Sequence, residues 1–536
     1  MSAVTGTGPL LRLASRRDRV LVPVSVLGLV AFTAGSARAT IDLYPTLAGA
    51  LAIFGPLINN PATVALYGPA TSLSLDSFAV YKTILLGGVF LCLLAYIVVR
   101  RHTRTEEEAG RLELLGAGVV QRRAPLTAAV TLGTLAVLAT AVFSGASLAG
   151  LGLDSRGSVA FAVSWVIMGL TWVGVTAVAA QLTETTRGTA AISLGALGVA
   201  FLLRALGDTS ATDSPGRFLV WLSPLGWGER VSPYGNNDFR PLWLGLAAYV
   251  LLVGAAFWLR ERRDLGAGLL PARAGHARGS LGSVSDLTLR LARGTLIGWA
   301  VTAVVLGLVV GSIATNVESI DASGSTGDVL RALARAQGSD ASLVDVFFAS
   351  ELHIGAYAVA ALGISIVTRL RTEETAMRAE ALLATGATRT RWALSHLVLA
   401  VVSTTAVMAV VGLLAGVAAT RSPAGPTDIS VGGLVEAALV TAPAIWVSVA
   451  VAMLLIGLAP RLTGLAWAAL IVFLLLGELV PVLRWPEWMT NLSPFGHVPS
   501  LPVGDLRWLP LVLLTVLAAL VAAAGLLALR RRDIPA

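Results

Sequence analysis

Long apolar runs separated by short charged stretches dominate the chain. The runs are about 20 residues long, the length that an α-helix needs to cross the hydrocarbon core of a bilayer. In the first part of the chain they lie at 20–37, 78–99, 126–148, 159–182, 189–206 and 242–259. In the second part they lie at 294–313, 346–368, 393–419, 434–458, 462–483 and 508–529. The pattern predicts an all-α polytopic membrane protein with 12 transmembrane helices.

Two shorter helices are expected outside these spans. Residues 9–19 mix leucines with Arg12, Arg16 and Arg17, a pattern typical of a helix that lies in the membrane interface. Residues 47–58 are apolar but short and interrupted by glycine and proline, so we expect a small external or interfacial helix there.

The second part of the chain repeats short segments of the first part in the same order. LRLA occurs at 11–14 and 289–292, VLGLV at 26–30 and 305–309, and RRD at 262–264 and 531–533, while LSPLG at 222–226 is matched by LSPFG at 492–496. Because chance matches would not stay collinear, we infer an internal duplication. We expect two tandem, parallel six-helix halves, 1–264 and 287–536, joined by a flexible cytosolic linker at 265–286.

Charge is scarce and unevenly placed. Only 13% of the 536 residues are charged, and the net charge is +8. Arginines follow spans such as 78–99 and 242–259. By the positive-inside rule, these span ends and both termini lie in the cytoplasm. We expect the protein in the plasma membrane. The basic charge therefore reflects membrane orientation, and we do not expect nucleic acid as a partner. The arginines before the first span precede a run long enough to stay in the membrane, so no cleavable signal peptide is expected.

A charged segment recurs between the second and third span of each half. It reads RTEEEAGRLELL at 104–115 and RTEETAMRAEAL at 371–382. In each copy we expect one helix, capped by Thr105 or Thr372, with Glu108 completing a capping box in the first copy. Glu107 and Arg111, and likewise Glu374 and Arg378, are four residues apart and are expected to pair.

These segments have two interpretations. They are either well-capped cytosolic helices with solvated charge or docking surfaces for a cytosolic partner, and we favour docking because the match extends beyond the first turn. The residues that we assign to docking are Thr105, Glu106, Glu107, Glu108, Arg111, Leu112, Glu113 and Leu115 in the first copy and Thr372, Glu373, Glu374, Arg378, Glu380 and Leu382 in the second.

Residues that could carry covalent chemistry are few. The single cysteine, Cys92, excludes an intramolecular disulfide, and the five histidines show no metal-ligand spacing. The single lysine, Lys82, follows a tyrosine, so the chain has no phosphate-binding loop. We expect no metal, no cofactor and no catalytic residue in this chain. A membrane-embedded transferase is therefore a weak alternative.

Ionisable residues in or near the spans are candidates for a transport pathway, because such residues are costly in hydrocarbon. The candidates for an outer vestibule are Lys82, Arg204, Asp208, Glu351, His353 and Glu478, and Glu436 stands at the start of the tenth span. The alternative is that most of them snorkel to the outer interface.

The charged segment, together with AQLTETTRG at 180–188, NPATVALYGPA at 60–70 and LSPLGWGE at 222–229, resembles a known family. The chain is similar to the fused, duplicated permease subunits of actinobacterial ATP-binding-cassette exporters assigned to polyketide antibiotics of the tetronasin type. The resemblance implies that 105–115 and 372–382 are coupling helices, each seated in one copy of a separate P-loop ATPase that binds ATP and Mg²⁺. It also implies a hydrophobic antibiotic or drug as substrate. An extra residue after Glu380 implies that the two docking sites need not be equivalent.

Two other transport functions stay open. An envelope lipid could be the exported compound. A proton-coupled multidrug transporter also has twelve spans, but its fold would be expected to show a Gly-Asp-Arg-type loop where this chain has an acidic segment.

Overall fold

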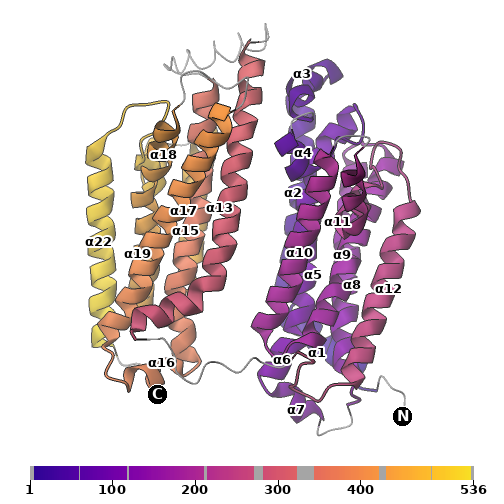
Figure 1. The fold of residues 1–536 in the computed structure, drawn as a ribbon, viewed down its shortest axis with the longest axis horizontal. Coiled ribbons are helices and arrows are strands. Elements are labelled where there is room, and N and C mark those ends of the chain that lie inside the picture. The colour runs from indigo at the N-terminus through magenta and orange to yellow at the C-terminus, as the bar shows by residue number, and fades with distance from the viewer. Residues whose placement is uncertain are drawn as a thin grey trace. The chain divides into compact units, whose positions relative to one another are not determined.

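The computed structural model describes residues 5–58, 61–116, 120–210, 214–270, 282–322, 343–421, 430–483 and 486–532. The chain forms two compact units, Met1–Gly275 and His276–Ala536. Figure 1 shows each unit as a bundle of long helices, with α6 and α7 at one end of the first bundle and α16 at one end of the second.

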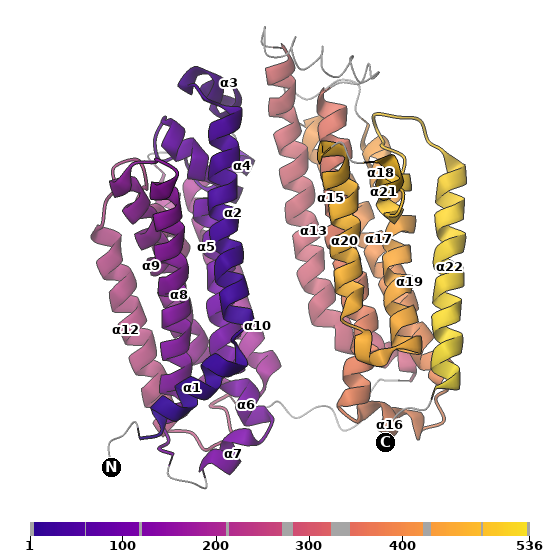
Figure 2. The ribbon, with the colours of Figure 1, turned by 180° about the vertical axis from the view of Figure 1, so that it is seen from behind.

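The first unit contains six long helices and several short ones. The long helices are α2 (Leu21–Leu43), α5 (Leu75–Arg101), α8 (Ala124–Gly150), α9 (Ser155–Leu182), α10 (Thr186–Thr209) and α12 (Arg240–Glu261). The short helices are α1 (Thr7–Arg17), α3 (Leu47–Ile58), α4 (Pro61–Tyr67), α6 (Arg104–Glu108), α7 (Arg111–Gly116), η1 (Pro215–Leu222) and α11 (Pro224–Glu229). Figure 2 shows α1 across the end of the bundle at which α6 lies.

The second unit also combines long helices with short ones. Its helices are α13 (Val284–Ala322), α15 (Leu343–Thr375), α16 (Arg378–Leu383), α17 (Arg389–Arg421), α18 (Val431–Leu439), α19 (Ala442–Leu458), η2 (Pro460–Leu462), α20 (Leu465–Leu483), α21 (Glu487–Thr490), η3 (Pro494–His497) and α22 (Trp508–Arg531).

Eleven helices of the described residues are long and apolar enough to cross a membrane. The remaining predicted span, 462–483, coincides with α20, whose described apolar stretch, Leu465–Gly477, is shorter. The helix expected at 47–58 is confirmed as α3, and 9–19 contains most of α1. The all-α, polytopic prediction is confirmed, whereas the arrangement of the two halves as parallel repeats stays a prediction.

The core of the first unit forms where α5 and α9 approach closely. The Trp165 indole of α9 donates a hydrogen bond to the Ile84 carbonyl of α5 at 3.0 Å. A Cβ atom at Gly87 would lie 2.3 Å from the Trp165 ring, and one at Gly88 would lie 2.3 Å from the Met168 sulfur. Glycine at both positions therefore lets the two helices meet at this distance.

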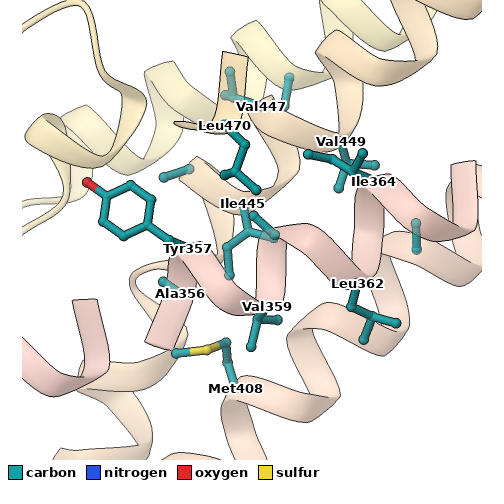
Figure 3. Packing of buried hydrophobic residues seen from close by; sticks show 14 of the residues in the cluster. Ala356, Tyr357, Val359, Leu362, Ile364, Met408, Ile445, Val447, Val449 and Leu470 are labelled. Carbon is teal, nitrogen blue, oxygen red and sulfur yellow. The ribbon is translucent and has the colours of Figure 1, made fainter. Parts of the chain in front are cut away.

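The core of the second unit is built from α15, α17, α19 and α20. In Figure 3, Val359 of α15, Met408 of α17, Ile445 of α19 and Leu470 of α20 belong to one packed cluster of buried side chains. Each unit therefore has its own apolar core and buries one face of several of its spans.

The predicted tenth span, 434–458, is not one straight helix. It divides into α18 and α19 at Val440 and Thr441, and Pro443 occupies the first turn of α19. Proline lacks a backbone N–H and interrupts the helical ladder at this place.

Candidate functional site

Each copy of the charged segment is broken in the middle, so the prediction of a single helix is wrong. In the first copy α6 ends at Glu108 and α7 begins at Arg111, with Gly110 in the left-handed region at φ 70°. In the second copy α15 runs on to Thr375 and α16 begins after Met377, which has φ 57°. Gly110 and Met377 occupy the same place in the repeated sequence. The two segments therefore share a left-handed break, which costs a methionine more than a glycine.

The predicted caps are also wrong. The side chain of Thr105 lies inside α6, and its hydroxyl makes no hydrogen bond within the described part of the chain. Thr372 lies within α15. Glu108 does not reach back: its carboxylate accepts hydrogen bonds from the backbone N–H of Thr186, at 2.8 Å, and from the Thr186 hydroxyl. Because only one short turn separates α5 from α6, the start of α6 is not a free helix end that needs a capping box.

Glu107 lies inside the protein among three arginines. Its carboxylate is paired with Arg104 at 2.8 Å, Arg260 at 2.6 Å and Arg263 at 2.8 Å. All four side chains are almost completely buried. The expected pair with Arg111 is wrong, because Arg111 is paired with Glu106 at 3.0 Å.

Backbone carbonyls and an amide satisfy the remaining guanidinium N–H groups of this cluster. Arg104 donates to the Ala180 carbonyl at 2.7 Å, and Arg263 donates to the Gln181 side chain at 2.9 Å and the Ala267 carbonyl at 2.8 Å. A buried charge is tolerated only when it is paired and hydrogen-bonded in this way.

Glu374 has a corresponding position in the second unit. It is buried and paired with Arg371 at 3.0 Å and with Arg532. The expected pair with Arg378 is therefore wrong as well. The neighbouring Glu373 accepts a hydrogen bond from the Trp392 indole at 3.2 Å and lies 3.4 Å from Arg369.

Within each unit, the glutamate of the charged segment makes the same pair of contacts with arginines at matching positions of the sequence. We call Arg104, Glu107 and Arg263 the first clamp, and Arg371, Glu374 and Arg532 the second clamp. In each clamp the glutamate of the charged segment joins an arginine three residues earlier to the second arginine of an RRD motif, at the end of α12 or just after α22. In each unit a further arginine, Arg122 or Arg389, donates to the carbonyl of that terminal arginine.

Burial divides the residues that were expected to dock a partner. Glu107, Leu112, Glu373 and Glu374 are buried, and Glu106 is mostly covered and paired with Arg17 of α1. Arg111, Glu113, Arg378 and Glu380 are exposed, as is Met377 at 50%. Leu382 is half-buried, and the side chain of Leu115 lies outside the described residues. The surface that a partner could touch is therefore narrower than the sequence segment.

A second charged cluster lies at the opposite end of α10 from Glu108. Arg204 is fully buried and donates to the carbonyls of Val64 at 3.0 Å and Ala65 at 2.5 Å. Asp208 lies 3.8 Å from Arg204 and is paired with Arg230 at 2.8 Å. The side chains of Arg204 and Asp208 are enclosed within the first unit, so they do not snorkel to an interface. Their place in an outer vestibule between the halves stays a prediction.

Glu229 completes this second cluster and was not among the predicted site residues. Its carboxylate lies 3.6 Å from Arg204, next to Gly68, where a Cβ atom would lie 2.4 Å away. Burial raises the pKa of the Glu229 carboxyl well above its usual range, because the charged form is desolvated and Asp208 lies nearby. The signal was present in the LSPLGWGE motif, which ends in this glutamate.

The other candidates for a transport pathway lie on different helices. Lys82 is exposed on α5. Glu351 and His353 are half-buried on α15, and the His353 ring lies 5.5 Å from Tyr357 and 6.0 Å from Phe495. Glu478 belongs to α20, but its side chain lies outside the described residues.

The bundles of long apolar helices define a multi-pass membrane protein. Residues 281–530 match the family model for the C-terminal domain of multidrug efflux system permease Rv1217c. The chain is 38% identical to the multidrug efflux system permease protein Rv1217c of Mycobacterium tuberculosis (strain ATCC 25618 / H37Rv), over 99% of this chain and 96% of that protein. The chain belongs to this family of multidrug efflux system permeases.

Proposed function

We propose that the chain is the membrane subunit of an ATP-driven exporter and that residues 104–115 and 371–382 dock two copies of a separate P-loop ATPase. ATP and Mg²⁺ would bind on those partners. The observation that carries this proposal is the matched pair of clamps, since each one fixes an acidic segment to the last helix of its own unit. The same match supports the inferred duplication.

The clamps give the segments a mechanical role. Movement of a partner against the first segment would reach α12 through Glu107, α10 through Glu108 and α1 through Glu106. Movement against the second would reach α22 through Glu374. Because buried ion pairs resist separation, the contacts of Glu107 and Glu374 would move α12 and α22 together with the segments.

The exposed residues of the segments would form the contact with the partner. The exposed residues that we assign to this contact are Arg111 and Glu113 in the first copy and Met377, Arg378 and Glu380 in the second. The buried glutamates then hold the segments in place and do not touch the ATPase.

The transported compound would be a hydrophobic antibiotic or drug taken from the cytosol or the inner leaflet. The relative from Mycobacterium tuberculosis is a multidrug efflux system permease, which supports this class. Polyketide antibiotics of the tetronasin type are the narrower proposal. The expected location is the cell membrane, with both termini in the cytoplasm.

Co-purification with an ATPase encoded beside this chain tests the docking surface. The combined substitutions Arg111→Glu, Glu113→Arg, Arg378→Glu and Glu380→Arg should abolish co-purification. Reversal of two exposed arginines at the other ends of the bundles, Arg156→Glu and Arg507→Glu, is the matched control. ATPase binding by the fourfold variant at the level of the unchanged protein would contradict the proposal, and so would ATP hydrolysis by the purified chain alone.

A further inference from the structure

The second unit contains an apolar cavity that the docking proposal does not use. Its volume is about 630 Å³, and it lies between α18, α19 and α22 at the start of α22, away from the second clamp. Its walls include Leu439, Trp446, Trp508, Val512 and Val516. The volume is within the range of about 300–1,000 Å³ that small-molecule sites occupy.

The break between α18 and α19 forms one wall of this cavity. Pro443, in the first turn of α19, lines it, and the Thr441 hydroxyl donates to the Ala438 carbonyl at 2.7 Å, which caps the end of α18. The Trp446 indole N–H donates to the Thr405 hydroxyl at 3.2 Å and so fixes the ring beside the cavity. Interrupted membrane helices form the substrate sites of many transporters, because their irregular backbone must face a cavity.

A single acidic side chain gives this apolar cavity its charge. Glu436 of α18 lines it, is exposed, and has no ion-pair partner in the described part of the chain. A cation beside this carboxylate would gain more than it would in water, because the walls are apolar. The indole faces of Trp446 and Trp508 also favour a cation nearby.

We propose that this cavity binds a hydrophobic monocation, with its apolar body between α19 and α22 and its positive charge beside Glu436. The proposal rests on the proposed function only in taking such a compound to be cargo of the permease. An acyl chain of a membrane lipid would fill the apolar space but would leave the Glu436 carboxylate unpaired. The structure therefore favours a small cationic amphiphile over a lipid tail.

Two ions of equal size and opposite charge test the charge preference. The purified full-length chain in phosphatidylcholine nanodiscs would be titrated with tetraphenylphosphonium and with tetraphenylborate. We expect tighter binding of the cation. Glu436→Gln should weaken cation binding by roughly five- to tenfold. Asp505→Asn, which removes a neighbouring carboxylate that does not line the cavity, should leave cation binding unchanged.

A second variant tests the location without changing charge. Gly432 lines the cavity, and a Cβ atom there meets no atom within 4 Å. Gly432→Leu should therefore fold, fill part of the cavity and weaken cation binding at least as much as Glu436→Gln. Gly298→Leu is the matched control, because Gly298 of α13 also has open space around it and does not line the cavity. Thermal unfolding of each variant checks that it is folded.

Three results would overturn the proposal. They are equal affinity for the two ions, cation binding that neither Glu436→Gln nor Gly432→Leu weakens, and cation binding in detergent that disappears in the nanodiscs because lipid occupies the cavity. These three results leave the proposed function untouched, because none of the binding measurements includes ATP or the ATPase partner. A chain that binds the cation at Glu436 but drives no ATP-dependent transport with its ATPase would overturn the exporter and keep the site.

Discussion

The two clamps are alike in design and different in strength. Glu107 is surrounded by three buried arginines, whereas Glu374 has two, and both of those are partly exposed. The difference arises at one position of the last helix: α12 carries Arg260 three residues before Arg263, and α22 carries the buried Leu529 three residues before Arg532. The first segment is therefore held more firmly, and the two charged segments are not equivalent in how they are anchored.

The largest expected effect comes from removing the clamp glutamates. Glu107→Ala leaves three buried guanidinium groups without a carboxylate and should destabilise the protein by about 3–5 kcal/mol. Glu374→Ala should cost clearly less, because water reaches Arg371 and Arg532. Thermal unfolding of the purified variants in detergent measures both. Equal losses of stability from the two substitutions would contradict the difference in strength between the clamps.

Substitutions at the left-handed break should change the stability of the protein in opposite directions in the two units. Gly110→Met places a side chain at positive φ and should destabilise the protein by about 1–2 kcal/mol. Met377→Gly relieves that strain and should stabilise it by up to about 1 kcal/mol, reduced by the greater freedom of glycine in the unfolded chain. The measurement is the shift in unfolding temperature. If both variants lost stability, the two breaks would not be the same structural feature.

Arg260→Leu leaves Glu107 with the two arginines of the first clamp, the same number that Glu374 has in the second. Glu107 keeps Arg104 and Arg263, so we expect a loss of about 1 kcal/mol or less, far below that of Glu107→Ala. A double-mutant cycle with Glu374→Ala, in the other unit, should give additive changes in the free energy of unfolding. A loss from Arg260→Leu as large as that from Glu107→Ala would mean that Arg260, and not the clamp arginines, holds Glu107 in place.

The smallest expected effect is a pH dependence of stability that belongs to the first unit. Where the LSPLGWGE motif has Glu229, the matching LSPFGHVP has Pro499. The pKa of Glu229 is raised in the folded state, so the folded protein holds this proton more tightly than the unfolded chain. Its contribution to stability is therefore present below the unfolded pKa of about 4.3 and is lost as pH rises through the folded pKa.

Glu229→Gln should remove that part of the pH dependence and stabilise the protein at the upper end of the range. Unfolding temperatures of the two proteins, recorded from about pH 4 upward, provide the measurement. Parallel curves for the variant and the unchanged protein would show that Glu229 does not carry the effect.

The helices and the charged segments were predictable because they depend on local pattern. Runs of about 20 apolar residues identify spans such as α5 and α9 directly, and the repeated RTEE sequence marks both segments. The partners of Glu107 were not predictable in this way. Arg260 and Arg263 lie 153 and 156 residues further along the chain, so their approach depends on the packing of α12.

The interior charges escaped prediction for a related reason. An arginine near the end of a span normally snorkels to the interface, and no local signal distinguishes Arg204, which turns inward to the carbonyls of Val64 and Ala65. The break at Met377 was equally hidden, since methionine favours a helix and rarely adopts positive φ. The cavity beside Glu436 requires three helices to be in place before it exists.

Transport by a variant of the second clamp tests most directly whether the clamps connect the charged segments to the last helix of each unit. The measurement is ATP-driven uptake of a hydrophobic drug into inverted vesicles that contain the chain and the proposed ATPase partner, with Glu374→Gln compared with the unchanged protein. We expect the variant to bind the ATPase within about twofold of the unchanged protein but to lose at least about tenfold in transport, because the docked segment is no longer fixed to α22. Transport at the unchanged rate by a folded Glu374→Gln complex would contradict the account.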